Sequence, residues 1–202
     1  MPSDYYRFLL EPRERQNFVG ASPELLVKKK DTNIETESLA GTIETGKSDR
    51  EKQKLADQLS SNPKDLEEHR IVVDSIVDDL HSLTTSLNVG ERDIRSLDSV
   101  QHLYTPIHAT ASSSQHILEY VKQLHPTPAV GGLPREEALQ SIRDVEPFDR
   151  GWYAGPLGWF DGEGNGCFAV GIRSALVRQR KAQFFAGAGI VSDSVPREEW
   201  DE

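Results

Sequence analysis

The feature that most constrains the fold is the closing third of the chain, where three strand-like segments follow one another with only short turns between them. The segments span 152–160, 166–177 and 182–191, and they are rich in apolar and aromatic residues. The connections, DGEGNG and RQRK, are too short for a crossover between parallel strands, whereas hairpins between antiparallel neighbours fit them. The sequence therefore predicts an antiparallel sheet in this region.

The rest of the chain alternates short strands with helices. A polar helix over 46–60 precedes an amphipathic helix that begins at Asn62, with Pro63 at its first helical position, and runs to about Leu83. Together with the antiparallel C-terminal region, this order predicts an α+β fold of largely antiparallel sheets packed with helices, which we expect to form one domain over 1–202. We further expect strands at 5–10, 17–21, 24–29, 33–42 and 102–110, a surface loop at 87–97, a Ser-capped helix at 112–125 and a helix at 133–145.

Composition narrows the class of protein. The formal net charge is -10, whereas nucleic acids and anionic membranes bind basic surfaces. The only cysteine, Cys167, excludes an internal disulfide framework and favours a reducing compartment. No apolar run approaches the roughly 20 residues of a membrane span, and the N-terminus lacks the pattern of a signal peptide. We therefore expect a cytoplasmic protein without nucleic-acid or membrane partners.

Helical geometry separates the adjacent acids Glu67 and Glu68 in the second helix. At about 100° per residue, the apolar side chains of this helix form one stripe. Glu67 points away from the stripe, and Glu68 lies on its shoulder, where a carboxylate needs a cation, a metal or several hydrogen-bond donors. Asp65 and His69 are close neighbours, and the alternative is an ordinary surface glutamate. The stripe consists of Leu66, Val72, Val73, Ile76, Val77, Leu80 and Leu83.

Two further charged residues stand beside apolar strands. Glu24 precedes Leu25-Leu26-Val27, so its carboxyl is a candidate general acid with a raised pKa, or else a strand-edge glutamate. Arg173 lies within the apolar segment 166–177, where we expect it to be buried. Since its guanidinium stays charged, it needs an anion, which is either a structural Asp or Glu or the carboxylate of a substrate.

Small residues mark two places where the backbone approaches another group closely. Gly41-Thr42 and the run 186–189, Ala-Gly-Ala-Gly, interrupt strand-like segments, and such glycines mark a ligand, a bulge or tight sheet packing. His102 on its own favours a structural role over that of a ligand. The sequence contains no zinc-binding spacing, no Walker motif and no dinucleotide-binding glycine loop followed by a helix.

Taken together, these positions resemble one family. Eight segments occur in the order found in the catalytic domain of chorismate-utilising enzymes, and within that family they are most similar to the isochorismate synthases. The resemblance covers residues 16–202. The segments are GASPELLV, ETESLAGT, NPKDLEEHRIVVDSI, HPTPAVGGLP, EPFDRGWYAGPLGWFD, VGIRSA, FAGAGIV and EEWDE.

The resemblance implies a role for each matching position. Glu24 of SPELL matches the general acid that protonates the departing C4 hydroxyl of chorismate. Glu68 of KDLEEH and Glu202 of EEWDE match the two glutamates that bind Mg²⁺. Substrate-binding positions fall on Gly41, Thr42, Ala129, Arg173 and Gly187, while His102 and Tyr153 match residues that line the site.

The activity implied by the resemblance is the Mg²⁺-dependent isomerisation of chorismate to isochorismate, for menaquinone or siderophore biosynthesis. Water adds at C2 while the C4 hydroxyl leaves with a proton from Glu24, and Arg173 holds the enolpyruvyl carboxylate. The rival activities in the family are anthranilate, aminodeoxychorismate and salicylate synthesis. The small Ala129 after Thr127-Pro128 favours the branch that adds a hydroxyl group.

Two departures from the family pattern bear on activity. The family's water-activating lysine lies well upstream of SPELL, and here only 23 residues precede Glu24. A second, substrate-contacting lysine follows EEWDE in the family, whereas Glu202 is the last residue here. We therefore expect an incomplete chain of an enzyme that is monomeric at full length. Its sheet edges and apolar faces should be exposed, and alone it should be inactive, an alternative being that it only binds ligand.

Overall fold

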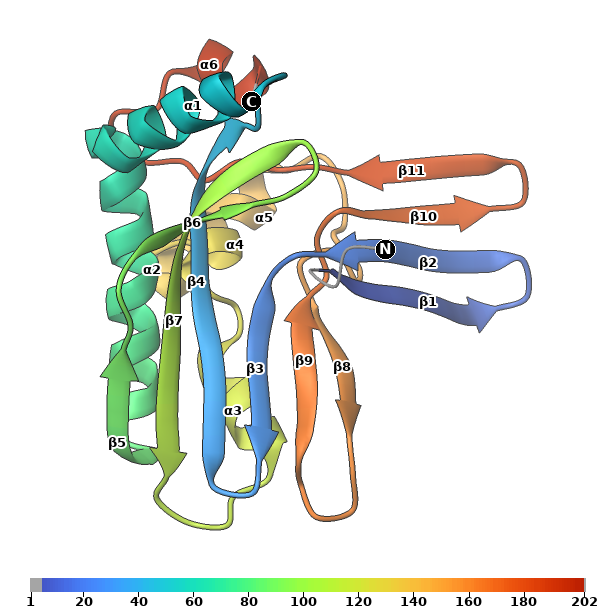
Figure 1. The fold of residues 1–202 in the computed structure, drawn as a ribbon. Coiled ribbons are helices and arrows are strands. Elements are labelled where there is room, and N and C mark those ends of the chain that lie inside the picture. The colour runs from blue at the N-terminus through green and yellow to red at the C-terminus, as the bar shows by residue number, and fades with distance from the viewer. Residues whose placement is uncertain (1–4, 202) are drawn as a thin grey trace.

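The computed structural model describes residues 5–201, which form two antiparallel sheets. The large sheet has the strand order β5-β7-β4-β3-β9-β8, with β6 also paired to β7, and the small sheet has the order β1-β2-β10-β11. In Figure 1 the small sheet projects from the side of the large one as two long hairpins. The strands are β1 Tyr6–Arg13, β2 Gln16–Ser22, β3 Leu25–Lys30, β4 Asn33–Glu44, β5 Thr84–Val89, β6 Asp93–Ser96, β7 Val100–Ala111, β8 Pro156–Phe160, β9 Gly166–Val170, β10 Ser174–Arg178 and β11 Lys181–Phe185.

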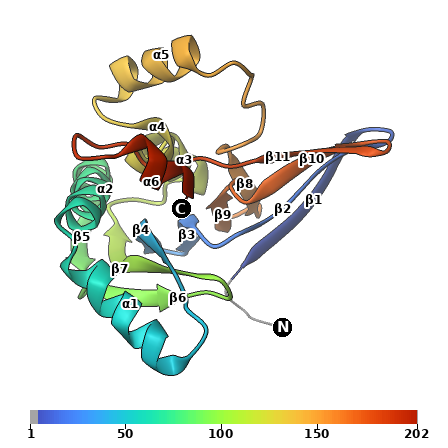
Figure 2. The ribbon, with the colours of Figure 1, turned by 90° about the horizontal axis from the view of Figure 1, so that it is seen from above.

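Helices α2 and α3 pack against the large sheet and enclose the main core (Figures 1 and 2). Helix α2 begins at the predicted Asn62–Pro63 start, whereas α1 begins at Asp49, three residues after the predicted start at Gly46. The Ser48 side chain accepts a hydrogen bond from the Glu51 N–H, and the Asn62 side chain accepts one from the Lys64 N–H. The helices are α1 Asp49–Ser61, α2 Pro63–His81, α3 Ile117–Leu124, α4 Pro128–Gly131, α5 Arg135–Val145 and α6 Pro196–Asp201. No helix of the described chain is long and apolar enough to cross a bilayer.

The predicted apolar stripe of α2 supplies its contact with the sheet. Val72, Ile76 and Leu80 are buried in the core with Val27 and Ile107 of the strands. Burial of apolar surface stabilises the folded state by roughly 25 cal/mol per Å² removed from water. The α+β prediction, with helices against the sheet faces, is therefore confirmed.

Strand β4 runs to Glu44, beyond the predicted end at Thr42, because it passes through a bulge. The register with β7 shifts between Ala40 and Thr42, and Gly41 has a φ of +74°. A Cβ on Gly41 would also lie 3.1 Å from the Asp65 Cβ of α2. A glycine therefore serves both the bulge and the close approach of the helix.

The predicted single strand over 166–177 is wrong, since this segment forms two strands in two sheets. Strand β9 belongs to the large sheet and β10 to the small one, and the chain turns between them at residues 171–173. Arg173 at this turn has a φ of +50°. A Cβ on Gly171 would lie 2.9 Å from the carbonyl oxygens of Trp152 and Gly155, so the turn packs too tightly for a larger residue.

Two local predictions are also corrected. Residues 87–97 are not a loop, because the end of β5 and the whole of β6 pair with the two ends of β7. Helix α3 begins at Ile117 rather than at the serines, and its cap is His116, whose Nδ1 accepts a hydrogen bond from the Leu118 N–H at 3.2 Å. The polar residues and the glycine of 87–97 are typical of a loop, and capping by histidine carries no strong local signal in a sequence.

Candidate active site

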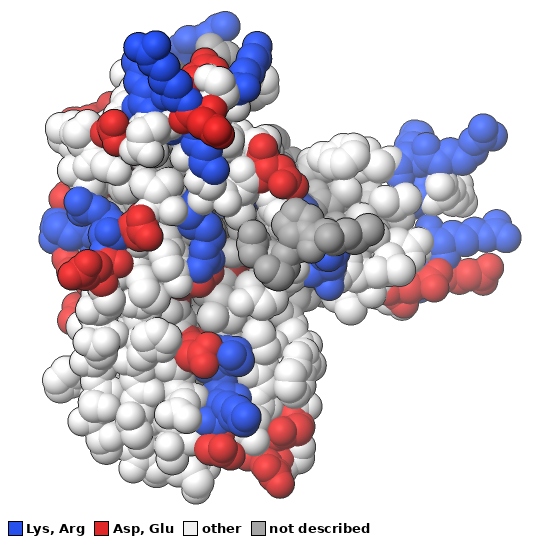
Figure 3. All heavy atoms as spheres, in the orientation of Figure 1, with Lys and Arg blue, Asp and Glu red and all other residues white. Residues whose placement is uncertain are grey.

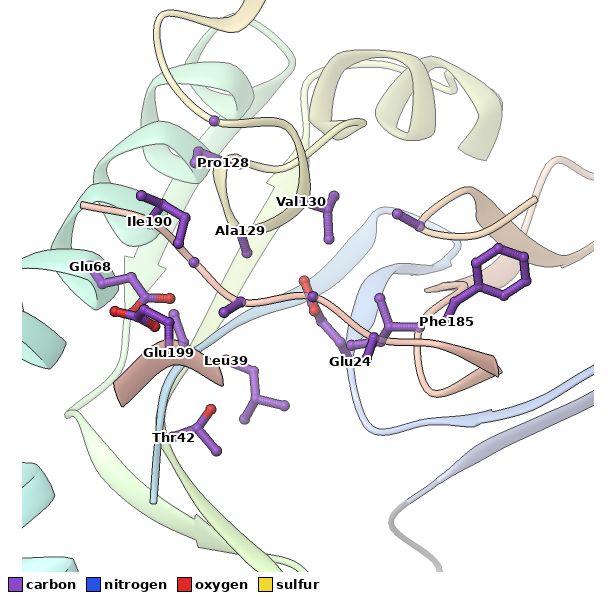
Figure 4. A pocket seen from close by; sticks show the side chains of 18 of the residues that line it. Glu24, Leu39, Thr42, Glu68, Pro128, Ala129, Val130, Phe185, Ile190 and Glu199 are labelled. Carbon is purple, nitrogen blue, oxygen red and sulfur yellow. The ribbon is translucent and has the colours of Figure 1, made fainter. Parts of the chain in front are cut away.

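One cavity of about 850 Å³ collects the predicted site residues. It lies where the two sheets meet, between α2, α4, α5 and the segment 186–190 (Figure 4). Every predicted site residue within the described chain lines it, and Glu202 lies outside the described residues. The predicted residues on its wall are Glu24, Gly41, Thr42, Glu68, His102, Ala129, Tyr153, Arg173 and Gly187.

Glu24 is held rigidly at the junction of β2 and β3. Its side chain is buried, its N–H donates to the Ser22 Oγ at 3.2 Å, and its carbonyl accepts from the Val170 N–H at 3.1 Å. Burial, assisted by the negative charge of Glu37, raises the pKa of its carboxyl from 4.5 to about 8. Glu24 is thus not an exposed strand-edge glutamate, and near neutral pH its carboxyl keeps a proton that it can donate.

His102 and Arg173 form a connected pair on the wall of the cavity. Thr42 of β4 lies directly across from His102 of β7, and the Thr42 Oγ1 is 3.1 Å from the His102 Nδ1. The Gly41 carbonyl is 3.3 Å from the same nitrogen, and the Arg173 Nη2 donates to the His102 Nε2 at 2.9 Å. Since arginine only donates, Nε2 is the acceptor and Nδ1 carries the proton.

The environment of His102 keeps its ring neutral. Burial and the charge of Arg173 lower the pKa of His102 from 6.5 to about 4, against a smaller opposing effect of the Gly41 carbonyl. A neutral ring can accept the hydrogen bond that orients the guanidinium, whereas a protonated ring would repel it.

Arg173 is exposed at the turn between β9 and β10, which corrects its predicted burial in a strand. Its Nη1 donates to the Tyr5 hydroxyl at 3.4 Å. Among the described residues no carboxylate lies within ion-pair distance of Arg173, so the structural Asp or Glu partner considered from sequence is not found there. Its guanidinium faces a cavity and offers donors to an anion.

The predicted difference between Glu67 and Glu68 is confirmed. Glu67 is exposed and binds Arg70 at 2.6 and 2.9 Å on the outer face of α2. Glu68 is half-buried and lines the cavity. Figure 4 shows its carboxylate next to that of Glu199 from α6, with Glu24 at the other side of Ala129.

Glu199 enlarges the acidic end of the cavity beyond the prediction, and the buried Asp65 interacts with its charge. Lys64 forms an ion pair with Glu199. Partial burial opposes ionisation of Glu199, but hydrogen bonds from Lys64 and Ser194 outweigh it and lower its pKa. Burial raises the pKa of Asp65, with Lys64 lowering it and Glu199 raising it. The sequence hinted at Asp65 through its spacing from Glu68, whereas Glu199 was missed because only the fold brings α6 to α2.

The glycine run over 186–189 allows the chain to pass close to the site residues. A Cβ on Gly187 would lie 2.7 Å from the Tyr153 hydroxyl, and one on Gly189 would overlap the Glu68 carboxylate. The Tyr153 ring stacks on Phe185 with centroids 5.2 Å apart. The expected close approach is therefore present, and the groups approached are protein side chains on the cavity wall.

The acidic end fits a hard divalent cation by its donor chemistry. Carboxylate oxygens are the ligands that Mg²⁺ prefers, and it keeps positions for water and substrate. Glu68 and Glu199 supply two such groups, and the predicted ligand Glu202 follows in sequence outside the described part of the chain. Within the described residues no three His, Cys, Asp or Glu side chains gather as a metal cluster.

The fold and the site define the class of protein. The chain belongs to the chorismate-binding enzymes, because the family model described as "Chorismate binding enzyme" matches residues 2–202.

Within this class the chain is similar to isochorismate synthases. It is 42% identical over 198 residues to isochorismate synthase MenF of Bacillus subtilis, covering 98% of this chain and 42% of that protein. It is 46% identical over 186 residues to the salicylate biosynthesis isochorismate synthase of Pseudomonas aeruginosa, covering 92% and 39%. The solved structure of the menaquinone-specific isochorismate synthase MenF from Escherichia coli superposes with a TM-score of 0.90 at 36% identity, covering 98% and 46%. The chain spans less than half the length of these relatives.

Proposed function

We propose that this chain carries the chorismate site of an isochorismate synthase. The observation that carries the proposal is the buried Glu24 carboxyl, with a pKa raised to about 8, in the same cavity as Arg173 and the Glu68–Glu199 acidic end. Chorismate is a dicarboxylate whose isomerisation requires a proton donor at the departing hydroxyl. The similarity to isochorismate synthases supports the same conclusion.

In the proposed reaction Glu24 donates its proton to the C4 hydroxyl, which leaves as water, while another water adds at C2 and loses a proton. The atoms balance, so the product is an isomer of the substrate. A proton donor with a pKa near the working pH is suited to this step. No lysine lines the cavity among the described residues, and the proposal assigns the base at C2 to none of them.

Arg173 binds the enolpyruvyl carboxylate in this proposal, and His102 holds its guanidinium in place. The guanidinium uses one N–H group to donate to the neutral His102 ring, and its remaining N–H groups can donate to a carboxylate. Gly41, Thr42, Ala129, Tyr153 and Gly187 form the surrounding wall and exclude solvent.

We assign the metal site to Glu68 and Glu202, and Glu199 lies next to Glu68. Mg²⁺ bound there supplies positive charge to the ring carboxylate of chorismate. Asp65 is buried, and its carboxyl interacts with the charges of Lys64 and Glu199.

We also infer the setting of the protein from its surface and its cysteine. Cys167 is half-buried and unpaired, and burial raises the pKa of its thiol, which suits a reducing cytoplasm. The proposed partner is chorismate rather than a macromolecule, and the proposed state is a monomer. The isochorismate feeds menaquinone or siderophore synthesis.

Chorismate binding in the presence of Mg²⁺, measured by isothermal titration calorimetry, tests the proposal directly. We expect Arg173→Ala to weaken binding about tenfold or more, because a charge-assisted pair is lost. Arg180→Ala, in the exposed turn between β10 and β11, is the matched control and should leave the affinity unchanged.

Glu24→Gln separates binding from chemistry. Because the amide keeps the shape but has no acidic proton, we expect near-normal chorismate affinity. Isochorismate formation by a longer protein that contains this chain should be lost. Absence of chorismate binding at millimolar concentration, or a product other than isochorismate, would contradict the proposal.

A further inference from the structure

The main chain next to Glu24 pairs with β9 on one side, whereas on the side of β4 a side chain holds it in place of a strand partner. The β3–β4 ladder ends at the pair Lys28–Glu35, and towards Glu24 the two strands diverge. In the gap, the Leu25 N–H donates to the Glu37 Oε1 of β4 at 3.1 Å. Glu37 therefore takes the place of a missing ladder bond at the residue that directly follows Glu24.

Glu37 is itself fixed by an arginine from a third strand. The Arg95 Nη1 and Nη2 of β6 donate to the two carboxylate oxygens of Glu37 at 2.7 and 3.0 Å. The Arg95 guanidinium lies 3.7 Å from the centre of the Tyr104 ring, and the Glu37 side chain is only 7% exposed. A two-pronged ion pair with a stacked guanidinium leaves Glu37 with little freedom to rotate.

We propose that Glu37, clamped by Arg95, is a positioning residue for Glu24: it fixes the main chain at the start of β3 and places a negative charge behind the Glu24 carboxyl. The role given to Glu24 rests on the proposed function, whereas the action of Glu37 on Glu24 does not depend on the substrate. The charge of Glu37 also favours the protonated form of Glu24, in the same direction as burial.

The other charged and titratable groups near this pair come from several elements, and none of them replaces Glu37. Arg95 is the only described side chain that forms an ion pair with Glu37, and among the described residues Glu37 supplies the charge that raises the pKa of Glu24. The remaining groups that face the pair or share the cavity are Tyr6, Tyr104, His102, Cys167, Arg173, Glu68, Glu146, Arg150, Tyr153 and Glu199.

Two variants separate the proposed effects of Glu37. Glu37→Gln keeps an oxygen that accepts from the Leu25 N–H but removes the charge. Glu37→Ala removes both. The titration of Glu24 is followed by the ¹³Cδ chemical shift in the ¹³C-glutamate-labelled chain without chorismate, and Glu24→Gln identifies the signal.

For Glu37→Gln we expect the midpoint of Glu24 to fall by about one pH unit or more, because a nearby negative charge is lost and Arg95 is left uncompensated. The Leu25 amide should stay protected from hydrogen exchange. For Glu37→Ala we expect the lower midpoint together with at least tenfold faster exchange at Leu25.

Glu35→Gln is the matched control, because Glu35 lies two residues away on the same strand but is exposed and paired with Lys28. It should leave the midpoint of Glu24 unchanged. If Glu37→Gln fails to fold around the unpaired Arg95, the neutral pair Glu37→Gln with Arg95→Gln is used, for which a smaller fall in the midpoint is expected.

An unchanged Glu24 midpoint in a folded Glu37→Gln or double variant overturns the proposal, and so does an equal shift in Glu35→Gln. Both results are independent of chorismate. Failure to bind chorismate would therefore overturn the proposed function, while the action of Glu37 on Glu24 would stand or fall by this titration.

Discussion

The two sheets are built from similar strands but differ in what covers them. In the large sheet Val27 and Ile107 are fully buried under α2 and α3. In the small sheet Leu9 is 68% exposed and Phe184 81% exposed. Figure 3 shows the projecting part of the molecule as largely uncharged along its length, with basic and acidic side chains gathered at its tip.

Within the small sheet, the base is covered by other side chains and the tip is not. At the base, Phe18 is buried between Phe8 and Phe185, and the Trp152 ring lies 5.9 Å away. Towards the tip no helix covers the strands (Figure 1). The cavity lies at the base, where Arg173 joins the two sheets, so the site depends on the covered sheet for burial and on the junction for its arginine.

The largest expected effect tests the covered sheet. Ile107→Ala should lower the free energy of unfolding by about 2–5 kcal/mol, because it leaves a cavity in the core. Urea unfolding followed by circular dichroism measures this. Val89→Ala is the control, since Val89 lies directly opposite Ile107 on β5 but is 40% exposed. An equal decrease in the free energy of unfolding for both variants would contradict the conclusion that helices bury Ile107 but leave Val89 exposed.

The second prediction concerns pH. The carboxyl of Glu24 has an ordinary pKa of 4.5 and a folded pKa of about 8, so the folded chain holds this proton more tightly. Its contribution to stability is complete below pH 4.5 and is lost as the pH rises to 8. We expect this group to lower the wild-type free energy of unfolding by about 3 kcal/mol between pH 5 and 8.

Glu24→Gln should lack this decline in the free energy of unfolding. His69 and His102 titrate in both proteins, so the difference between the two pH curves reports on Glu24 alone. Urea unfolding at several pH values gives the two curves. Glu35→Gln, on the exposed part of β4, should follow the wild type. If the free energy of unfolding depends on pH in the same way for wild type and Glu24→Gln, burial does not raise the pKa of Glu24.

A third prediction concerns the cavity wall where the segment 186–189 passes Glu68. Gly189→Ala places a methyl group on the Glu68 carboxylate and should lower the free energy of unfolding by about 1–3 kcal/mol. It should also weaken Mg²⁺-dependent chorismate binding, because Glu68 has to move. Gly162→Ala is the control, since a Cβ there meets no atom within 4 Å. Isothermal titration calorimetry should therefore show a loss of chorismate affinity in Gly189→Ala but not in Gly162→Ala.

The smallest effect is expected at the uncovered sheet. Phe184→Ser should change the free energy of unfolding by no more than about 0.5 kcal/mol, because the ring is already in water. Solubility should rise as apolar surface is removed. A loss comparable to that of Ile107→Ala would mean that this face is covered in solution, and sedimentation analysis would then identify a self-associated state.

The sequence predicted much of this architecture because local patterns encode it. The apolar stripe of α2 follows helical periodicity, and the same geometry correctly assigned Glu67 to solvent and Glu68 to the cavity. The cap of α2 at Asn62 and the turn at 178–181 also carry local signals. The glycines over 186–189 indicated close approach, although not which side chains are approached.

Other features escaped prediction because they depend on partners distant in the chain. The apolar pattern of 166–177 is the same whether one strand or two are formed, and only sheet pairing divides it. The contact between His102 and Arg173 joins residues 71 positions apart, and that between Glu37 and Arg95 joins residues 58 apart. No local periodicity reports such contacts.

The sequence by itself determined the elements, the antiparallel class and the family, since propensities, periodicity and motif order are local properties of the chain. Only the tertiary structure decided that Glu24 is buried, that Arg173 is exposed, and that Glu37 and Glu199 belong to the site. The physical reason is that burial, strand register and the pKa of a carboxyl depend on neighbours that the fold assembles from distant segments.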